Sequence, residues 1–326
     1  MIKTNLITGF LGSGKTTTLR HLLAHKPADE KWAILVNEFG EIGIDGALLA
    51  GQGAAIKEIP GGCLCCVAGL PMQIGLNMLI SREKPDRLLI EPTGLGHPKQ
   101  VLSMLSGEHY ETVLDLRATL CVLDARQLAD PRYRDNENFR DQLAAADVLI
   151  ANKADVYQPA DHAAFAALLA ERHDLSAHQV VAQGAINPEL LDLPCHQHQL
   201  TDSATHNAAR QHAAAKPLSA VMSLQSHERW RRAENQGQGY YSCGWIFDHD
   251  TVFDMTQILE WARTAPVQRA KGMVRIAGGT LRFNRQQHEF EIETADSAPA
   301  DSRVELIDTE RGPWNSLQTA LLAARQ

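Results

Sequence analysis

Residues 9–16 read "GFLGSGKT", and this stretch decides the fold. It fits the pattern G-x-x-x-x-G-K-[ST], follows the apolar run "NLIT" and precedes "TTTLRHLLAH", whose apolar spacing favours a helix. A glycine-rich turn between a strand and a helix presents backbone N–H groups and the positive helix end to phosphate oxygens. The sequence therefore predicts a phosphate-binding loop, and a chance glycine-rich turn is the alternative.

Three glycines, Gly9, Gly12 and Gly14, let the backbone of this loop curl around phosphates together with Ser13. Lys15 is expected to reach the β- and γ-phosphates of a nucleoside triphosphate, and the Thr16 hydroxyl is expected to ligate Mg²⁺. Both residues are therefore candidates for the catalytic machinery.

The chain as far as about residue 190 alternates short apolar runs with stretches of helical character. The apolar runs are "NLIT", "WAILVN", "DRLLIEP", "RATLCVLD" and "DVLIANK". Such alternation is typical of βαβ units, and it places ligand-binding loops at the carboxyl ends of the strands. We therefore expect an α/β fold, a P-loop NTPase domain over 1–190 with a doubly wound, mostly parallel sheet.

The remainder of the 326-residue chain follows another pattern, and its length also favours two domains. Residues 191–216 are rich in Ala, Gln and His without a clear period and are expected to form an exposed linker. Strand-like runs joined by polar turns, with one or two helices, predict a smaller α+β domain over 217–326. Cys121 and Cys243 lie in apparent strands and are expected in the cores.

Composition excludes several classes of partner. The net charge is -8 and the 14 histidines are scattered, which argues against nucleic acid or anionic lipid as a general partner. No run of about 18 apolar residues occurs, and the first residues resemble no secretory signal. We therefore expect a cytoplasmic enzyme, and in that compartment clustered cysteines favour metal or redox chemistry over structural disulfides.

Asn152-Lys153-Ala154-Asp155 follows a strand-like run and fits N-K-x-D. The two oxygens of the Asp155 carboxylate can accept hydrogen bonds from N1–H and the 2-amino group of guanine. Adenine has an acceptor at N1 and no amino group at C2, so it would leave the carboxylate unmatched. The motif favours GTP over ATP, and an ordinary polar loop after a strand is the alternative.

Two further carboxylates are expected near the phosphates. Glu91 ends the run "RLLIE" and would emerge from the sheet beside the phosphate loop, where Mg²⁺ or its water shell sits. Asp45 lies in "NEFGEIGIDG", a stretch suited to a loop that senses the γ-phosphate, and could reach Mg²⁺ or the attacking water. A polar strand end and a solvated loop are the respective alternatives.

Cys63, Cys65 and Cys66 lie in "GGCLCC" and supply three soft ligands after two glycines. Three ligands do not close a tetrahedral Zn²⁺ site, so the fourth must be Glu38, Glu41, a histidine, water or a client protein. An incomplete site suits metal exchange better than permanent structural binding. Buried small side chains and a redox pair remain open as alternatives.

Taken in order, "TGFLGSGKTT", "VNEFGEIGIDGALL", "GGCLCC", "IEPTGLGHP" and "ANKAD" resemble the CobW-type family of metal-chaperone GTPases. The resemblance extends to "AKGMVRIAGG" and "DSRVELI" near the C-terminus. It implies that 12–17, Thr17 included, holds phosphates and Mg²⁺, that Glu91 is the Walker B acid, and that Asn152 reads guanine with Lys153 and Asp155. It also implies that the cysteine triplet binds zinc and couples it to the nucleotide state.

The family often carries a histidine-rich tract, which here is thin. His196 and His198 could gather metal weakly with His206 and His212, or the segment could be a plain solvated linker. The expected function is slow, Mg²⁺-dependent hydrolysis of GTP to GDP and phosphate that governs delivery of Zn²⁺ to a client protein. A metal-dependent homo-oligomer is a further expectation. Two rival functions are a non-catalytic zinc buffer and a GTPase chaperone for a cobalt or corrinoid enzyme.

Overall fold

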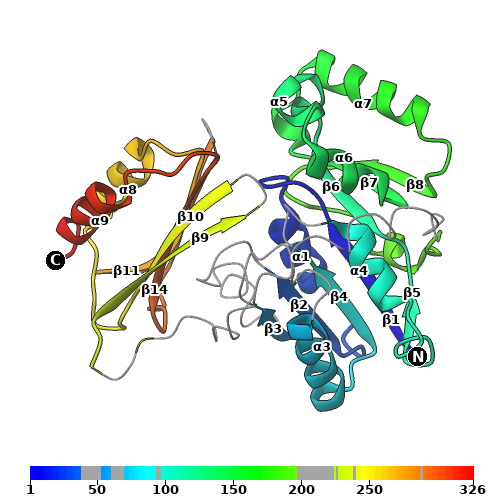
Figure 1. The fold of residues 1–326 in the computed structure, drawn as a ribbon, viewed down its shortest axis with the longest axis horizontal. Helices are drawn as coiled ribbons and strands as arrows, with labels where there is room; N and C mark the ends of the chain where they lie inside the picture. Colours follow the sequence, from blue (N-terminus) through cyan, green and yellow to red (C-terminus); the bar gives the residue numbers. More distant parts are fainter. Residues whose placement is uncertain are drawn as a thin grey trace, which may run out of the picture. The chain divides into compact units, whose positions relative to one another are not determined.

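The computed structural model describes residues 1–37, 53–59, 70–92, 97–196, 224, 227–237, 240–286 and 289–326. These residues separate into two compact units, one containing the described residues up to 196 and the other those from 224 onward (Figure 1). Five of the site residues predicted from the sequence lie outside the described residues: Asp45, Cys63, Cys65, Cys66 and His198.

The first unit alternates strands and helices along the chain. Its strands are β1 (Ile2–Thr8), β2 (Trp32–Asn37), β3 (Ala55–Ile59), β4 (Arg87–Glu91), β5 (Leu114–Leu116), β6 (Leu120–Asp124), β7 (Val148–Asn152) and β8 (Ala177–Val180). Its helices are α1 (Lys15–Ala24), α3 (Leu70–Glu83), α4 (Pro98–Leu105), α5 (Pro131–Arg134), α6 (Glu137–Ala144) and α7 (Pro159–Glu171). Short 3₁₀ helices are η1 (Ala125–Ala129), η2 (Ala154–Val156) and η3 (Pro188–Asp192).

The described strands of this unit form one sheet in the order β3-β2-β4-β1-β6-β7-β8, with β5 also paired to β1. Their pairings are parallel. The chain winds outward from β1 to β2 and β3, returns to β4 beside β1, and then continues on the other side with β6. This order confirms the expected doubly wound sheet and leaves the loop after β1 at its centre, where such folds bind ligands.

Both faces of the sheet are covered, which explains why the inner strands β4, β6 and β7 are buried at every position. On one face Ile7, Leu89 and Val122 pack with Leu19 and Leu22 of α1. On the other face, α3 and α4 cover the half of the sheet around β2 and β4, and Phe165 of α7 covers the half around β6 and β7. Cys121 is 1% exposed in that second layer, as expected of a core residue.

Residues 191–196 pack on the first unit, although the sequence suggested that the linker begins at 191. Leu191 is buried, the Ala118 amide donates to the Leu193 carbonyl at 2.8 Å, and Arg117 pairs with Pro194 in an isolated bridge. Residues of this segment therefore have partners within the first unit, whereas Asp192, Pro194 and His196 are exposed.

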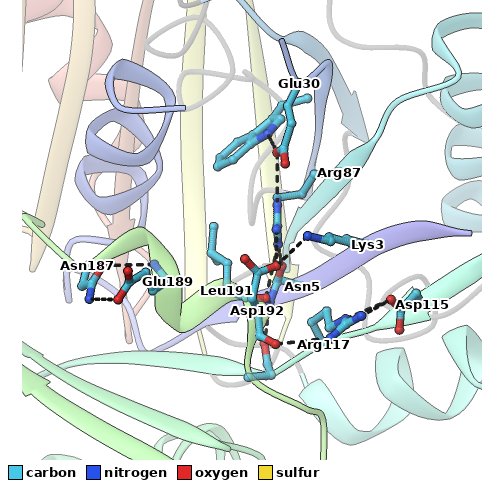
Figure 2. A network of polar contacts seen from close by, with 12 residues as sticks. Lys3, Asn5, Glu30, Arg87, Asp115, Arg117, Asn187, Glu189, Leu191 and Asp192 are labelled. Atoms are coloured by element: carbon cyan, nitrogen blue, oxygen red, sulfur yellow. Dashed lines mark hydrogen bonds and ion pairs between the residues drawn. The ribbon is translucent and has the colours of Figure 1, made fainter. Parts of the chain in front are cut away.

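A buried arginine binds this segment at the amino ends of the parallel strands. Arg87, 3% exposed, donates to Asn5 Oδ1 at 2.9 Å, to the Leu191 carbonyl at 3.2 Å and to Asp192 Oδ1 at 2.6 Å. Figure 2 shows its guanidinium directed at Asn5 and Asp192, with Lys3 also directed at Asp192. The guanidinium therefore has several partners that offset the cost of burying its charge.

The second unit is an antiparallel sheet with two helices. Its strands are β9 (Trp230–Gly237), β10 (Tyr240–Phe247), β11 (Arg269–Ile276), β12 (Gly279–Gln286), β13 (Glu289–Ala295) and β14 (Ser302–Asp308), and its helices are α8 (Met255–Thr264) and α9 (Trp314–Ala323). The described strands follow the order β13-β12-β11-β14-β10-β9. This confirms a second, smaller unit of α and β structure, although β9 carries no clear alternation and was not anticipated.

Both helices of the second unit lie on one face of its sheet (Figure 1). Ile258 and Trp261 of α8 pack with Leu317 of α9 over Trp245 and Phe247 of β10. Cys243 lies fully buried in this layer, as expected. Among the helices that the structure describes in either unit, none is long and apolar enough to cross a membrane.

Candidate nucleotide site

The turn between β1 and α1 adopts a conformation that only glycine accepts easily. Gly9, Gly12 and Gly14 have φ values of 140°, 72° and 99°, and Gly14 precedes the first residue of α1. A Cβ at Gly9 would lie 2.1 Å from the Val122 carbonyl oxygen, and one at Gly14 would lie 2.2 Å from Asn152 Nδ2. The loop is thus both left-handed and tightly enclosed, which explains the glycines.

Lys15 lies over this loop. Its ammonium donates to the carbonyl oxygens of Gly9 at 2.9 Å and Phe10 at 3.3 Å, and the residue is 8% exposed. The first residue of α1 thus carries a cation where the helix N-terminus is already positive. Such an arrangement favours an anion at the loop, because the positive end and the buried ammonium lie close together.

Thr16 and Glu91 lie next to each other at the carboxyl ends of the strands. Thr16, in the first turn of α1, lies with its Oγ1 3.5 Å from Oε1 of Glu91 at the end of β4. Glu91 is 3% exposed. The structure therefore brings together the hydroxyl and the carboxylate that the sequence analysis assigned to Mg²⁺, although these assignments remain predictions.

Asn152 serves as a bridge inside the protein. Its Nδ2 donates to the Ser13 carbonyl at 3.1 Å, and its Oδ1 accepts from the Gly184 amide at 2.9 Å. The side chain is 2% exposed, so it connects the end of β7, the phosphate loop and the loop after β8. Its role in this structure is to position the two loops, which the assignment to base reading did not anticipate.

The other residues of the N-K-x-D motif follow directly after β7. Lys153 has a left-handed φ of 68°, and its ammonium lies 3.9 Å from Asp124 Oδ2. Asp155 is exposed in η2. Its exposure leaves the carboxylate accessible to a ligand at the carboxyl ends of the strands. Its assignment to guanine stays a prediction.

Sequence reasoning missed three residues around this loop. Gln142 of α6, 1% exposed, accepts hydrogen bonds through Oε1 from the Thr8 hydroxyl and, at 2.9 Å, from the Gly9 amide. Tyr157 donates to the Asn152 carbonyl and accepts from the Ala125 amide at 2.7 Å. Burial raises the pKa of Tyr157, so its hydroxyl stays protonated and able to donate.

The third missed residue, Gly184, follows strand β8. Its φ is 69°, and a Cβ there would lie 2.7 Å from the Thr18 amide nitrogen of α1. A glycine soon after a strand end is a signal that could have identified this loop from the sequence. Gln142, by contrast, sits in an ordinary helical pattern, and no sequence signal distinguishes it.

The weak metal tract is only partly described. The His196 amide donates to Asp147 Oδ1 at 3.0 Å, and its ring lies 3.0 Å from the Ser176 hydroxyl. Burial and the neighbouring Asp147 raise the pKa of Cys195 to about 12, which disfavours the thiolate that binds metals. Within the described ranges, no group of three or more His, Cys, Asp and Glu side chains is arranged to hold a metal ion.

Together the described residues form a site for a phosphorylated ligand. A left-handed glycine loop, a helix N-terminus and a buried lysine favour the phosphates, and a hydroxyl and a carboxylate offer hard oxygen ligands beside them. The loops that carry these groups are held by Gln142 and Asn152. The site is thus preorganised by contacts within the protein rather than assembled from isolated side chains.

Family models match both units. The model described as "CobW/HypB/UreG, nucleotide-binding domain" matches residues 3–182. The model described as "Cobalamin synthesis protein cobW C-terminal domain" matches residues 242–325. The first match covers the phosphate loop, Glu91 and the N-K-x-D motif, and it ends before Gly184.

Similar proteins include a relative that matches this chain along its full length. The zinc chaperone YeiR of Escherichia coli (strain K12) is 58% identical over 326 residues, covering 100% of this chain and 98% of the relative. The zinc chaperone CobW of a Sinorhizobium species is 31% identical over 183 residues, covering 48% of this chain and 51% of the relative. Among solved structures, Zn(II)-bound YjiA GTPase from E. coli covers 100% of this chain and 99% of its own, with 20% identity and a TM-score of 0.42.

Proposed function

The chain belongs to the CobW/HypB/UreG family of nucleotide-binding proteins, and on that premise we propose that it is a zinc chaperone that binds and hydrolyses GTP. One observation carries the proposal: the phosphate loop, Glu91 and Asn152 converge at one edge of the sheet. The full-length identity of 58% to a zinc chaperone supports the metal part.

Nucleotide binding begins at the phosphates. The amides of the loop and of the first turn of α1 hold the phosphate oxygens, and Lys15 exchanges its carbonyl partners for the β- and γ-phosphates. Asp155, on the same edge, accepts from guanine N1–H and the 2-amino group. Asn152 keeps the two loops at a fixed separation for both contacts.

The residues present fit Mg²⁺. Thr16 and Glu91 offer a hydroxyl and a carboxylate oxygen, the donor types that Mg²⁺ prefers beside substrate phosphates. Bound there, Mg²⁺ would neutralise charge on the transferring phosphoryl group. Dependence of turnover on Mg²⁺ is therefore part of the proposal.

Hydrolysis makes modest covalent demands on the protein. A water oxygen bonds to the γ-phosphorus while the bond to the β–γ bridging oxygen breaks, giving GDP and phosphate. Lys15 balances the charge on the oxygens of the transferring group, and Asp45 is proposed to orient the water. We expect slow turnover, because a switch has to remain in one nucleotide state while metal is loaded.

Zinc is the cargo of the proposed cycle. Cys63, Cys65 and Cys66 are its proposed ligands, because three thiolates hold Zn²⁺ firmly and leave one position for exchange. Nucleotide state is proposed to change the affinity of the triplet and so to direct Zn²⁺ to a client metalloprotein in the cytoplasm. The weaker ligands His196 and His198 remain a secondary proposal.

The GTPase part is tested by Lys15→Ala. This variant should keep the fold, since one cation is removed from a loop that Gln142 and Asn152 still hold, but should lose most GTP hydrolysis. Phosphate release is measured with Mg²⁺ present, and circular dichroism monitors folding. The matched control is Lys31→Ala, an exposed lysine at the amino end of β2 that pairs with Glu83. Near wild-type turnover of a folded Lys15→Ala protein would contradict the mechanism.

A further inference from the structure

Two histidines one turn apart lie at the end of α1, His21 in its last turn and His25 at its C-cap, on a different side from the buried leucines of the helix. His21 and His25 are spaced i and i+4, which places their side chains on the same helix face. Their ring centroids are 4.2 Å apart and the ring planes are inclined by 31°. The packing of α1 on the sheet uses Leu19, Leu22 and Leu23, so the histidine pair is not needed for that contact.

One ring of the pair is anchored by a backbone group. His25 Nδ1 lies 2.8 Å from the His21 carbonyl oxygen. An imidazole that uses one nitrogen on a backbone carbonyl has a fixed ring orientation and leaves its other nitrogen for a second partner. This is the arrangement usual for histidines that ligate metal ions.

The surroundings keep the pair suited to a cation. The adjacent Lys26 ammonium donates hydrogen bonds to the carbonyl oxygens of Pro27 at 3.4 Å and Glu30 at 3.1 Å. These two oxygens are therefore partners for its positive charge. His25 is exposed, so an ion can reach the pair from solvent.

We propose that His21 and His25 form a second, exchangeable zinc-binding site on α1, separate from the cysteine triplet. Two imidazoles at i and i+4 on one helix face are a recurrent ligand pair for Zn²⁺. Imidazole also suits Cu²⁺ and Ni²⁺, whereas Mg²⁺ prefers oxygen ligands, so the site selects borderline-soft divalent ions.

Two protein ligands leave the coordination sphere of Zn²⁺ incomplete. Water or another molecule must supply the remaining positions, and this favours exchange over retention. The site therefore binds zinc more weakly than a three-thiolate site would. The inference concerns metal binding by this helix and does not depend on GTP hydrolysis or on a client protein.

The test measures how fast diethyl pyrocarbonate modifies each histidine in the full-length chain, read by peptide mass spectrometry. This reagent attacks an unprotonated ring nitrogen, so a bound metal slows it. Increasing Zn²⁺ should slow modification of His21 and His25 with a common midpoint, while His173, an exposed histidine at the end of α7, keeps its rate. Mg²⁺ at the same concentrations should leave all three rates unchanged.

The variant His25→Gln separates metal binding from ring packing. Loss of a partner that only orients a ligand typically costs 10–100-fold in metal affinity, so loss of a ligand should raise the Zn²⁺ midpoint at His21 by roughly tenfold or more. His173→Gln is the matched control and should leave the midpoint unchanged. His25 is exposed at the helix end, so folding should survive, and circular dichroism checks this. Equal midpoints at His21 in the wild type and His25→Gln, or no zinc protection of His25, would overturn the proposal.

Discussion

Truncation of Asn152 to alanine should weaken nucleotide binding, although this side chain points into the protein. The change removes two hydrogen bonds, to the Ser13 carbonyl and from the Gly184 amide. Each is worth about 1 kcal/mol net, and each buried group left without a partner costs about 1–3 kcal/mol. The truncated side chain leaves room for water beside these groups, so we take the lower part of that range.

The expected total is about 2–3 kcal/mol, which corresponds to roughly a 30- to 140-fold change in an equilibrium constant. The loss should appear in two measurements. The first unit should unfold more easily without nucleotide, and the dissociation constant of GDP should rise by about tenfold or more, because the loops are no longer held in their binding conformation. Fluorescence titration with a labelled guanine nucleotide measures the second effect.

The sheet offers a matched control in Asn5→Ala. Asn5 is also a buried amide, and it donates to the carbonyl oxygens of Ala118 and Leu191 at 3.0 Å each and accepts from Arg87. Its loss should cost similar stability while leaving the nucleotide dissociation constant nearly unchanged, since its partners hold the 191–196 segment (Figure 2). Equal nucleotide affinities of a folded Asn152→Ala protein and the wild type would refute the positioning role.

Two further predictions concern single carboxylates. Asp155→Asn should weaken the binding of GTP and improve the relative binding of xanthosine triphosphate, because an amide can donate to the carbonyl that replaces the guanine amino group. Unchanged GTP affinity in a competition assay would contradict the base-reading role of Asp155. Burial would raise the pKa of Asp192, but hydrogen bonds from Arg87 and Lys3 lower it on balance. Its stabilising contribution is therefore present above the usual Asp pKa of about 3.9 and is lost as the pH falls through the lowered folded value. Asp192→Asn should flatten the acid limb of a thermal-unfolding series, and an unaltered acid limb would contradict this.

The sequence predicted those parts of the fold that depend on local patterns. The phosphate loop is specified by a short motif with a fixed order of strand and helix, and the apolar runs of β1, β4, β6 and β7 match strands buried on both faces. Strand β9 lacks such a run because it is an edge strand of the second sheet. Its backbone pairing with β10 determines its position there.

The contacts that hold the site were harder to predict. Gln142 reaches Gly9 across 133 positions and Asn152 reaches Ser13 across 139, and no local pattern encodes such distances. The 191–196 segment likewise reads as polar linker because its partners, Arg87 and Asp147, lie far away in the sequence. Motifs identify the groups expected to touch a ligand, whereas the residues that position those groups become visible only with the tertiary structure.

The central claim, that one chain couples a zinc site to a GTP site, is tested most directly by measuring GTP affinity with and without Zn²⁺. Thermodynamic reciprocity requires each ligand to change the affinity of the other by the same factor, and typical coupling of about 1–3 kcal/mol predicts roughly a 5- to 150-fold effect. Conversion of Cys63, Cys65 and Cys66 to serine should abolish that effect and keep nucleotide binding, since serine oxygen is a poor ligand for Zn²⁺. Equal GTP affinities of the wild-type chain with and without Zn²⁺ would contradict the account.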